Sequence, residues 1–107
     1  MFYKKDKENY RNAFDGVTYK TLVYGDKTSL GEFFLEKGSI VPTHSHPHEQ
    51  TGYMISGRMN FKIAGEDHNA EAGDSWSIPG NVEHSVEVLE DSVVIEVFSP
   101  VREDYLL

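Results

Sequence analysis

Short stretches rich in β-branched and aromatic residues recur along the chain and are separated by turns. Val17 to Tyr24 is the clearest of them, and Leu30 to Lys37 and Ile40 to His46 follow it. Apolar and polar positions that alternate over about four to eight residues predict half-buried strands. No stretch shows a convincing helical period of about 3.6 residues, so we expect an all-β fold.

The second half of the chain predicts two hairpins. One turn is expected at Ser56-Gly57 and the other at Glu90-Asp91, because each pair is flanked by strand-like sequence. Trp76, on a short strand between the hairpins, is expected to be a packing residue. The strands predicted in this half are Thr51 to Ile55, Arg58 to Ala64, Ala70 to Ala72, Ser75 to Ile78, Val82 to Leu89 and Ser92 to Phe98.

About nine short strands, with a turn every six to twelve residues or so, are typical of an all-β sandwich or barrel. Closing the sheet removes exposed strand edges, which favours a jelly roll over an open sheet. With 107 residues the chain is long enough for one hydrophobic core, so we expect a single domain. Residues 17–107 are expected to form the barrel, and residues 1–16 an N-terminal arm or an edge strand.

Composition and charge argue against several classes of function. The formal net charge is −8, with ten basic residues scattered among eighteen acidic ones, so we expect no nucleic-acid partner. No apolar run approaches the ~20 residues of a membrane span, and the first residues are too charged for a signal peptide. We therefore expect no membrane partner and a cytoplasmic location. The chain has no cysteine, so any metal ligands must be nitrogen and oxygen atoms.

Three of the five histidines lie within Thr-His-Ser-His-Pro-His-Glu-Gln, the eight residues that end at Gln50. His44 and His46 are two residues apart, so in a strand their side chains point to the same face and can bind one metal ion. Gln50 and, far downstream, His84 are further donors, and three imidazoles with one side-chain oxygen suit a divalent transition metal. The alternative for each histidine alone is a solvated or hydrogen-bonded residue near a strand end.

Two spaced motifs resemble those of the cupin family. In the first motif, five residues separate Gly38 from His44-Ser-His46, three residues separate His46 from Gln50, and six residues separate Gln50 from Gly57. In the second motif, five residues separate Gly73 from Pro79, and His84 lies five positions after Pro79. Gln50 stands where most cupins have glutamate, and the usual second glycine of the second motif is displaced, to Gly80. The resemblance implies a single-domain jelly-roll barrel, or double-stranded β-helix, with a metal bound by His44, His46, Gln50 and His84.

A narrower resemblance, to the small pectin-degradation cupins of the KdgF type, covers most of the chain. It rests on the histidine-rich segment, on Ile78 to His84 and on Phe98 to Tyr105. That family converts 4,5-unsaturated uronate monosaccharides into open-chain keto sugars, so the resemblance implies a lyase or isomerase that acts on a sugar acid. The positions that match its acidic, phenylalanine and arginine residues near the site are Glu96, Phe98 and Arg102, and the acid there is more often aspartate.

The residues themselves favour such chemistry. Neutral Gln50 leaves the full charge on a divalent ion, which makes it a stronger Lewis acid and less suited to oxygen activation. Glu96 lies among apolar neighbours, so lost hydration would raise its pKa and make it a proton donor; the alternative is a solvent-facing position. Arg102 can bind a substrate carboxylate through two parallel hydrogen bonds, or form a surface ion pair with Glu103 or Asp104.

Several further expectations are less specific. Tyr53 and Arg58 are candidates for the substrate pocket wall, and His48 and Glu49 either orient the ligand histidines or are solvated loop residues. The metal is left open among nickel, zinc, manganese, iron and cobalt. A polar arm, an aromatic tail and a small core predict a homodimer. A cupin dioxygenase and a non-catalytic sugar-binding or effector-binding cupin are the alternative functions.

Overall fold

Within residues 1–106, which the computed structural model describes, the chain forms strands and one short helix. The strands are β1 (Arg11–Phe14), β2 (Val17–Tyr24), β3 (Ser29–Leu35), β4 (Ile40–His44), β5 (Glu49–Ile63), β6 (Glu66–Glu71), β7 (Ser75–Ile78) and β8 (His84–Ser99). The helix is the 3₁₀ turn η1 (Glu103–Tyr105). The expected all-β fold is confirmed. No helix in this part of the chain is both long and apolar enough to cross a membrane.

The two hairpins predicted from the sequence are wrong, because β5 and β8 are long strands that bend without ending. Gly57 has a φ of +96°, which glycine adopts without strain, and the pairing of the two strands shifts register around it. The bends fit closely together, since a Cβ on Gly57 would lie 2.4 Å from the carbonyl oxygen of Asp91. Each expected turn is therefore a change of direction within a continuous strand.

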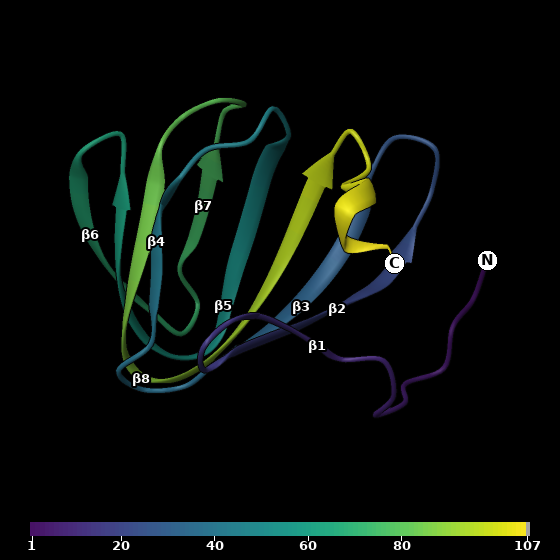
Figure 1. The fold of residues 1–107 in the computed structure, drawn as a ribbon, viewed down its shortest axis with the longest axis horizontal. Coiled ribbons are helices and arrows are strands. Elements are labelled where there is room, and N and C mark those ends of the chain that lie inside the picture. Colours follow the sequence, from purple (N-terminus) through teal and green to yellow (C-terminus); the bar gives the residue numbers. More distant parts are fainter. Residues whose placement is uncertain (107) are drawn as a thin grey trace.

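These bends divide the β-structure into two facing sheets that share β5 and β8 (Figure 1). The first half of β5 and the second half of β8 form one sheet with β1, β2, β3 and β7. The other halves form the second sheet with β4 and β6. The jelly roll is confirmed, but its strand ladder is not closed as we expected. The described edges are the strands β1, β4, β6 and β7, and short edge strands limit pairing with other chains.

The hydrophobic core lies between the two sheets. Met54, Met59, Ile78 and Val88 are each at most 2% exposed. Full burial of an aliphatic side chain of this size stabilises a fold by about 1.5 to 3 kcal/mol. Because these residues come from β5, β7 and β8, the core holds the shared strands in register, and this register sets the positions of the site residues.

The two ends of the chain lie on the sheet that contains β2 and β3. β1 pairs with β2 at its edge, and residues 1–10 precede it without forming a strand (Figure 1). The Tyr10 hydroxyl donates to Glu32 at 2.6 Å and ties this segment to β3. At the other end, the ring centroid of Tyr105 in η1 lies 4.3 Å from that of Tyr19. The Thr21 hydroxyl donates a hydrogen bond to the backbone carbonyl oxygen of Tyr105. The C-terminal turn is thereby held beside the space between the sheets.

Candidate metal centre and ligand cavity

Three histidines from three segments meet in the space between the sheets. His44 ends β4, His46 lies in the loop that follows, and His84 begins β8. The antiparallel pairing of β4 with β8 places His44 directly opposite His84. One ring nitrogen from each histidine lies within 4.8 Å of those from the other two. The three rings are therefore able to bind one metal ion, as the spacing of the motifs led us to expect.

Backbone carbonyl groups hold all three rings in one tautomer. The Nδ1 atoms of His44, His46 and His84 lie 2.8, 3.0 and 2.9 Å from the carbonyl oxygens of Pro42, His48 and Val82. A carbonyl oxygen only accepts hydrogen bonds, so each Nδ1 carries the proton and each Nε2 presents a lone pair. Backbone carbonyl groups commonly orient metal-binding histidines in this way.

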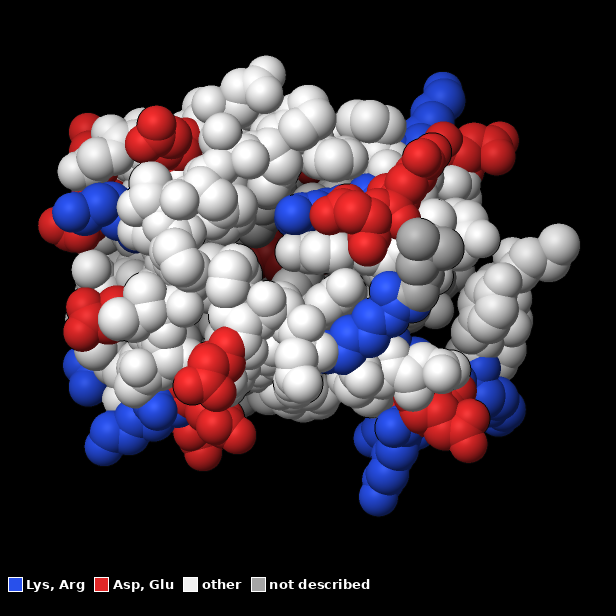
Figure 2. Space-filling view, viewed as in Figure 1, with Lys and Arg blue, Asp and Glu red and all other residues white. Residues whose placement is uncertain are grey.

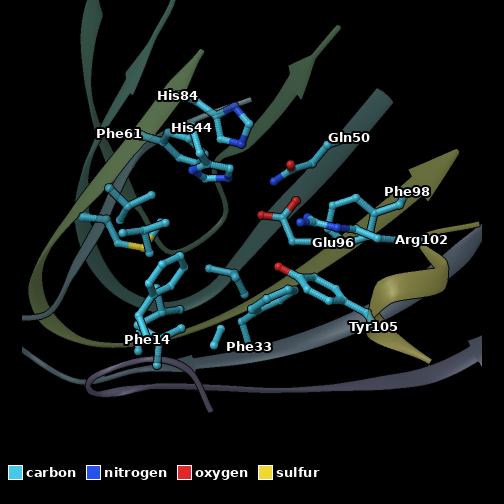
Figure 3. A pocket seen from close by; sticks show the side chains of 17 residues that line it. Phe14, Phe33, His44, Gln50, Phe61, His84, Glu96, Phe98, Arg102 and Tyr105 are labelled. Carbon is cyan, nitrogen blue, oxygen red and sulfur yellow. The ribbon is translucent and has the colours of Figure 1, made fainter. Parts of the chain in front are cut away.

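Gln50 adds an oxygen to the three nitrogens. Its Oε1 lies 3.0 Å from Nε2 of His46, and its amide nitrogen points toward Glu96 (Figure 3). Both facing atoms carry lone pairs and neither carries a hydrogen in the tautomer given above. Such a contact is repulsive unless a cation lies close to both atoms. The donor set of three imidazoles and one amide oxygen, with no thiolate, therefore fits a divalent transition metal.

Burial favours the uncharged form of two of the candidate ligands. It lowers the pKa of His46, and it lowers the pKa of His84 to about 4, because a charged imidazolium loses its hydration there. The hydrogen bonds to the backbone carbonyls oppose this effect only in part. Neutral imidazole is the form that binds metal ions, so protons do not compete for these nitrogens at pH 7.

A cavity of about 70 Å³ adjoins the histidines between the two sheets. At roughly 30 Å³ per water molecule, it has room for an ion with water or for one end of a small ligand. This face of the molecule is hollowed near its middle, with acidic atoms inside the hollow (Figure 2). Apolar side chains form most of the cavity wall, as in many sites for small molecules. Its polar lining is His44, Gln50, His84, Glu96, Arg102 and Tyr105 (Figure 3).

Glu96 lies on the inner face of β8 and is 5% exposed. Val94 and Phe98, two positions to either side, are buried with it, so the solvent-facing alternative for Glu96 is wrong. Loss of hydration raises the pKa of Glu96 to about 8. Hydrogen bonds from Gln50 and Trp76 and the positive charge of Arg102 act in the opposite direction. The site therefore has a carboxyl group that holds its proton near neutral pH.

Arg102 lies just after β8 and covers two aromatic rings. Its guanidinium carbon is 3.9 Å from the ring centroid of Tyr105 and 5.0 Å from that of Phe98. Its Nε donates to the Asp104 carboxylate at 3.3 Å. The expected ion pair with Asp104 is formed, and Arg102 also lines the cavity. Phe98 is 2% exposed and lies with its ring centroid 5.8 Å from that of His46.

The structure corrects the expectation for Tyr53 and Arg58, which do not line the cavity. Tyr53 points outward from β5 and is 50% exposed, because the inward positions of this strand are Gln50, Gly52 and Met54. Arg58 lies beyond the bend of β5 and forms an exposed ion pair with Glu90, with 3.7 Å between Nε and Oε2.

His48 contributes to the site through its backbone. Its carbonyl oxygen accepts the hydrogen bond from Nδ1 of His46, whereas its own ring Nδ1 is buried without a hydrogen-bond partner. Glu49 is exposed and pairs with Ser99 in the β5–β8 ladder. Of the two residues, His48 therefore orients a candidate ligand, and it does so through a main-chain atom that the sequence pattern could not single out.

Two residues of the site were given no role in the chemistry when we read the sequence. Trp76 packs against Phe61 as expected, with 5.0 Å between ring centroids, but its indole nitrogen also donates to Glu96. Tyr105 lies in the stretch that resembles the KdgF type, and its position in the cavity follows only from the packing of η1.

Comparison with known proteins places the whole chain among related sequences. Residues 31–99 match the family described as cupin domain. The pectin degradation protein KdgF of Dickeya dadantii (strain 3937) is 31% identical over 107 residues, which represent 98% of this chain and 97% of that protein.

Two solved structures resemble the fold over nearly its full length. KdgF from Halomonas sp. has a TM-score of 0.87 and 28% identity, with 92% of each chain covered. An RmlC-like cupin from Shewanella frigidimarina NCIMB 400 has a TM-score of 0.91 and 25% identity, with 98% of this chain and 95% of that chain covered. The similarity to the Shewanella cupin covers enough of this chain to include the segment that carries Arg102 and Tyr105.

Proposed function

Since this chain belongs to the cupin family, we propose that it is a metal-dependent enzyme of pectin degradation that opens 4,5-unsaturated uronate monosaccharides to linear keto sugars. The observation that carries the proposal is one cavity that is lined by three of the four candidate metal donors, a buried acid and an arginine. The similarity to KdgF over almost the whole chain supports the assignment to pectin degradation.

The four donors of the candidate centre are His44, His46, His84 and Gln50. A divalent ion held there would act as a Lewis acid on oxygen atoms of a substrate, with its charge undiminished because all four donors are neutral. The protein contributes the orientation of the rings, through the three carbonyl groups that bind Nδ1, and an apolar wall that limits water around the reacting atoms.

Glu96 is the proposed proton donor. Ring opening of the uronate breaks the bond between the ring oxygen and the anomeric carbon, and the hydroxyl group on that carbon loses its proton to become an aldehyde. The electron pair left on the ring oxygen forms an enolate next to the carboxylate, and a proton must reach the neighbouring carbon to give the ketone. A carboxyl group buried beside the cavity can supply this proton. The carboxylate left behind recovers the proton that the anomeric hydroxyl group released, directly or through water, so the net change is an isomerisation.

Arg102 is proposed to bind the substrate carboxylate. Its guanidinium group lines the cavity near Glu96 and is stacked on Tyr105, which limits its freedom before a ligand arrives (Figure 3). A guanidinium group can form two parallel hydrogen bonds to a carboxylate. Phe98, beneath the guanidinium, would form an apolar side of the same subsite.

The test is a spectroscopic assay with the metal-loaded protein and an unsaturated galacturonate or guluronate monomer. Loss of the double bond should lower the absorbance at about 235 nm, and the rate of this loss should exceed that in the buffer control. A rate equal to that of the control would contradict the proposal. In that case, substrate-dependent oxygen uptake by the iron-loaded protein would indicate a dioxygenase, and saturable binding of the sugar without turnover would indicate a binding cupin.

We also propose that the protein is a homodimer that pairs through the outer face of the larger sheet. Phe34 on β3 and Tyr53 and Ile55 on β5 lie on this face, on either side of β8, and are 39%, 50% and 47% exposed, an unusual amount for large apolar side chains in one sheet. A two-fold axis would bury the same patch of both copies at once. Sedimentation equilibrium should give twice the chain mass for the wild type and a monomer for Ile55→Glu. A monomeric wild type at tens of micromolar would contradict the proposal.

A further inference from the structure

Trp76, the one tryptophan of the chain, makes a contact that packing alone does not require. Its indole Nε1 donates a hydrogen bond that is shared between the carboxyl oxygens of Glu96, at 3.1 and 3.2 Å. β7, which carries Trp76, and β8, which carries Glu96, lie on opposite sides of β5. The two side chains therefore reach one another across the middle strand of the sheet.

This contact exists because residue 52 has no side chain. Gly52 lies between the partners on β5, paired with Trp76 on one side and with Glu96 on the other. A Cβ at this position would lie 2.2 Å from Nε1 of Trp76 and 2.5 Å from Oε2 of Glu96, so any larger residue would separate them. The φ of Gly52 is not in the left-handed region, so the backbone conformation does not demand glycine here. The requirement for glycine comes from the space that the tryptophan and the acid share.

Hydrogen-bond direction gives the contact a consequence for proton transfer. An indole N–H only donates, so a proton carried by the Glu96 carboxyl group cannot lie between that group and the indole. The amide nitrogen of Gln50, which also points toward Glu96, is likewise only a donor (Figure 3). With donors on both of these sides, the carboxyl group is held in one orientation, and its remaining hydrogen-bonding positions face the cavity that it lines.

We propose that Trp76 is a positioning residue: its indole N–H, laid across Gly52, fixes the orientation of the Glu96 carboxyl group at the ligand cavity. The inference rests on the proposed role of Glu96 as the proton donor. It differs from a packing role because it requires the N–H group and not only the aromatic ring. Trp76→Phe keeps an aromatic ring against Phe61 and removes only the donor and the second ring.

The contact itself can be tested without any activity or metal. Because Trp76 is the only tryptophan, the ¹⁵N-labelled metal-free protein gives a single indole N–H signal by NMR. Slow hydrogen exchange of this signal is expected in the wild type, in Glu96→Gln, which keeps an acceptor oxygen, and in Ser77→Ala, a matched exposed position on β7. Fast exchange is expected in Glu96→Leu. Equal exchange rates in the wild type and Glu96→Leu would overturn the proposal.

The catalytic consequence is tested by a double-mutant cycle on the metal-loaded protein. Trp76→Phe should lower kcat about 10-fold while KM and bound metal stay unchanged, and Ser77→Ala should behave as the wild type. In the Glu96→Gln background, Trp76→Phe should have no further effect on kcat, because the carboxyl group that Trp76 positions has already been replaced by an amide. Independent, additive losses, or an unchanged kcat in Trp76→Phe, would overturn the proposal.

The two experiments separate this inference from the proposed function. A wild type with no activity on the unsaturated uronate would contradict the function, and the indole signal would still decide whether Trp76 holds Glu96. An active wild type in which Trp76→Phe lowers kcat equally with and without the Glu96 carboxyl group would leave the function standing and remove the positioning role.

Discussion

The Nε2 atom of His46 faces Oε1 of Gln50 at 3.0 Å, and in the tautomer set by the carbonyl oxygen of His48 neither atom has a hydrogen to share. Two lone pairs at this distance stabilise the fold only if a positive charge lies between or beside them. The relationship thus marks the space beside these two atoms as the place for a cation.

Replacement of Gln50 tests the value of a neutral oxygen donor. Gln50→Ala should weaken metal binding by more than about 10-fold and lower activity in parallel, because it removes one donor. Gln50→Glu should retain the metal but reduce turnover, since a carboxylate cancels one unit of the ion's charge. Metal affinity by calorimetry and kcat by the absorbance assay distinguish the two effects. Full turnover in Gln50→Glu would show that the neutral donor has no catalytic importance.

Loss of the acid should separate chemistry from metal binding. Glu96→Gln keeps the size of the side chain and an acceptor for the Trp76 N–H, but it cannot deliver a proton. Turnover should fall about 100-fold or more while the metal content stays at the wild-type level. Metal analysis of the same preparations is the control. If Glu96→Gln turned over at the wild-type rate, the proton would have to come from another group.

Replacement of the arginine should affect substrate binding more than the centre itself. Arg102→Lys loses the planar group that stacks on Tyr105 and can bind a carboxylate through two hydrogen bonds. KM should rise about 10-fold, which corresponds to ~1.4 kcal/mol of binding free energy. Arg58→Lys is the matched control, because Arg58 is paired with Glu90 outside the cavity. An equal effect of both substitutions on KM would contradict the assignment.

The buried acid should make the stability of the metal-free protein depend on pH. Burial raises the pKa of Glu96 from its ordinary 4.5 to about 8, so the folded state binds this proton more tightly than the unfolded state does. Its contribution to the free energy of unfolding is full below about pH 4.5 and is lost as pH rises toward about 8. Urea unfolding at about pH 5 and pH 8 should show a larger loss for the wild type than for Glu96→Gln. Parallel losses in the two proteins would contradict this expectation.

A methyl group at Gly52 should disturb both the fold and the tryptophan. Gly52→Ala would place Cβ 2.2 Å from Nε1 of Trp76, so the indole must move. We expect a loss of about 1 to 3 kcal/mol in the free energy of unfolding and a change in tryptophan emission. Gly25→Ala is the control, since nothing lies within 4 Å of a Cβ there. Similar stability of the two variants would show that the site accommodates the extra atom.

Some features of the site followed from local chemistry in the sequence. The two-residue spacing of His44 and His46 indicated a shared metal, and the alternation around Glu96 allowed an inward position beside Phe98. The turn signals were less informative, because Gly57 marks a bend within β5 where the sequence predicted the end of a strand. A glycine with positive φ serves a turn and a bulge equally well, and only the pairing of β5 with β8 decides between them.

The sequence by itself determined which atoms are available: nitrogen and oxygen donors without sulfur, an acid in an apolar stretch, and an arginine near the C-terminus. The tertiary structure decided which of them meet. The opposition of His44 to His84, the carbonyl groups behind each ring and the reach of Trp76 across Gly52 to Glu96 all depend on the register of strands from distant parts of the chain. That register is set by the packing of the two sheets against one core, a property of the whole fold that no local pattern contains.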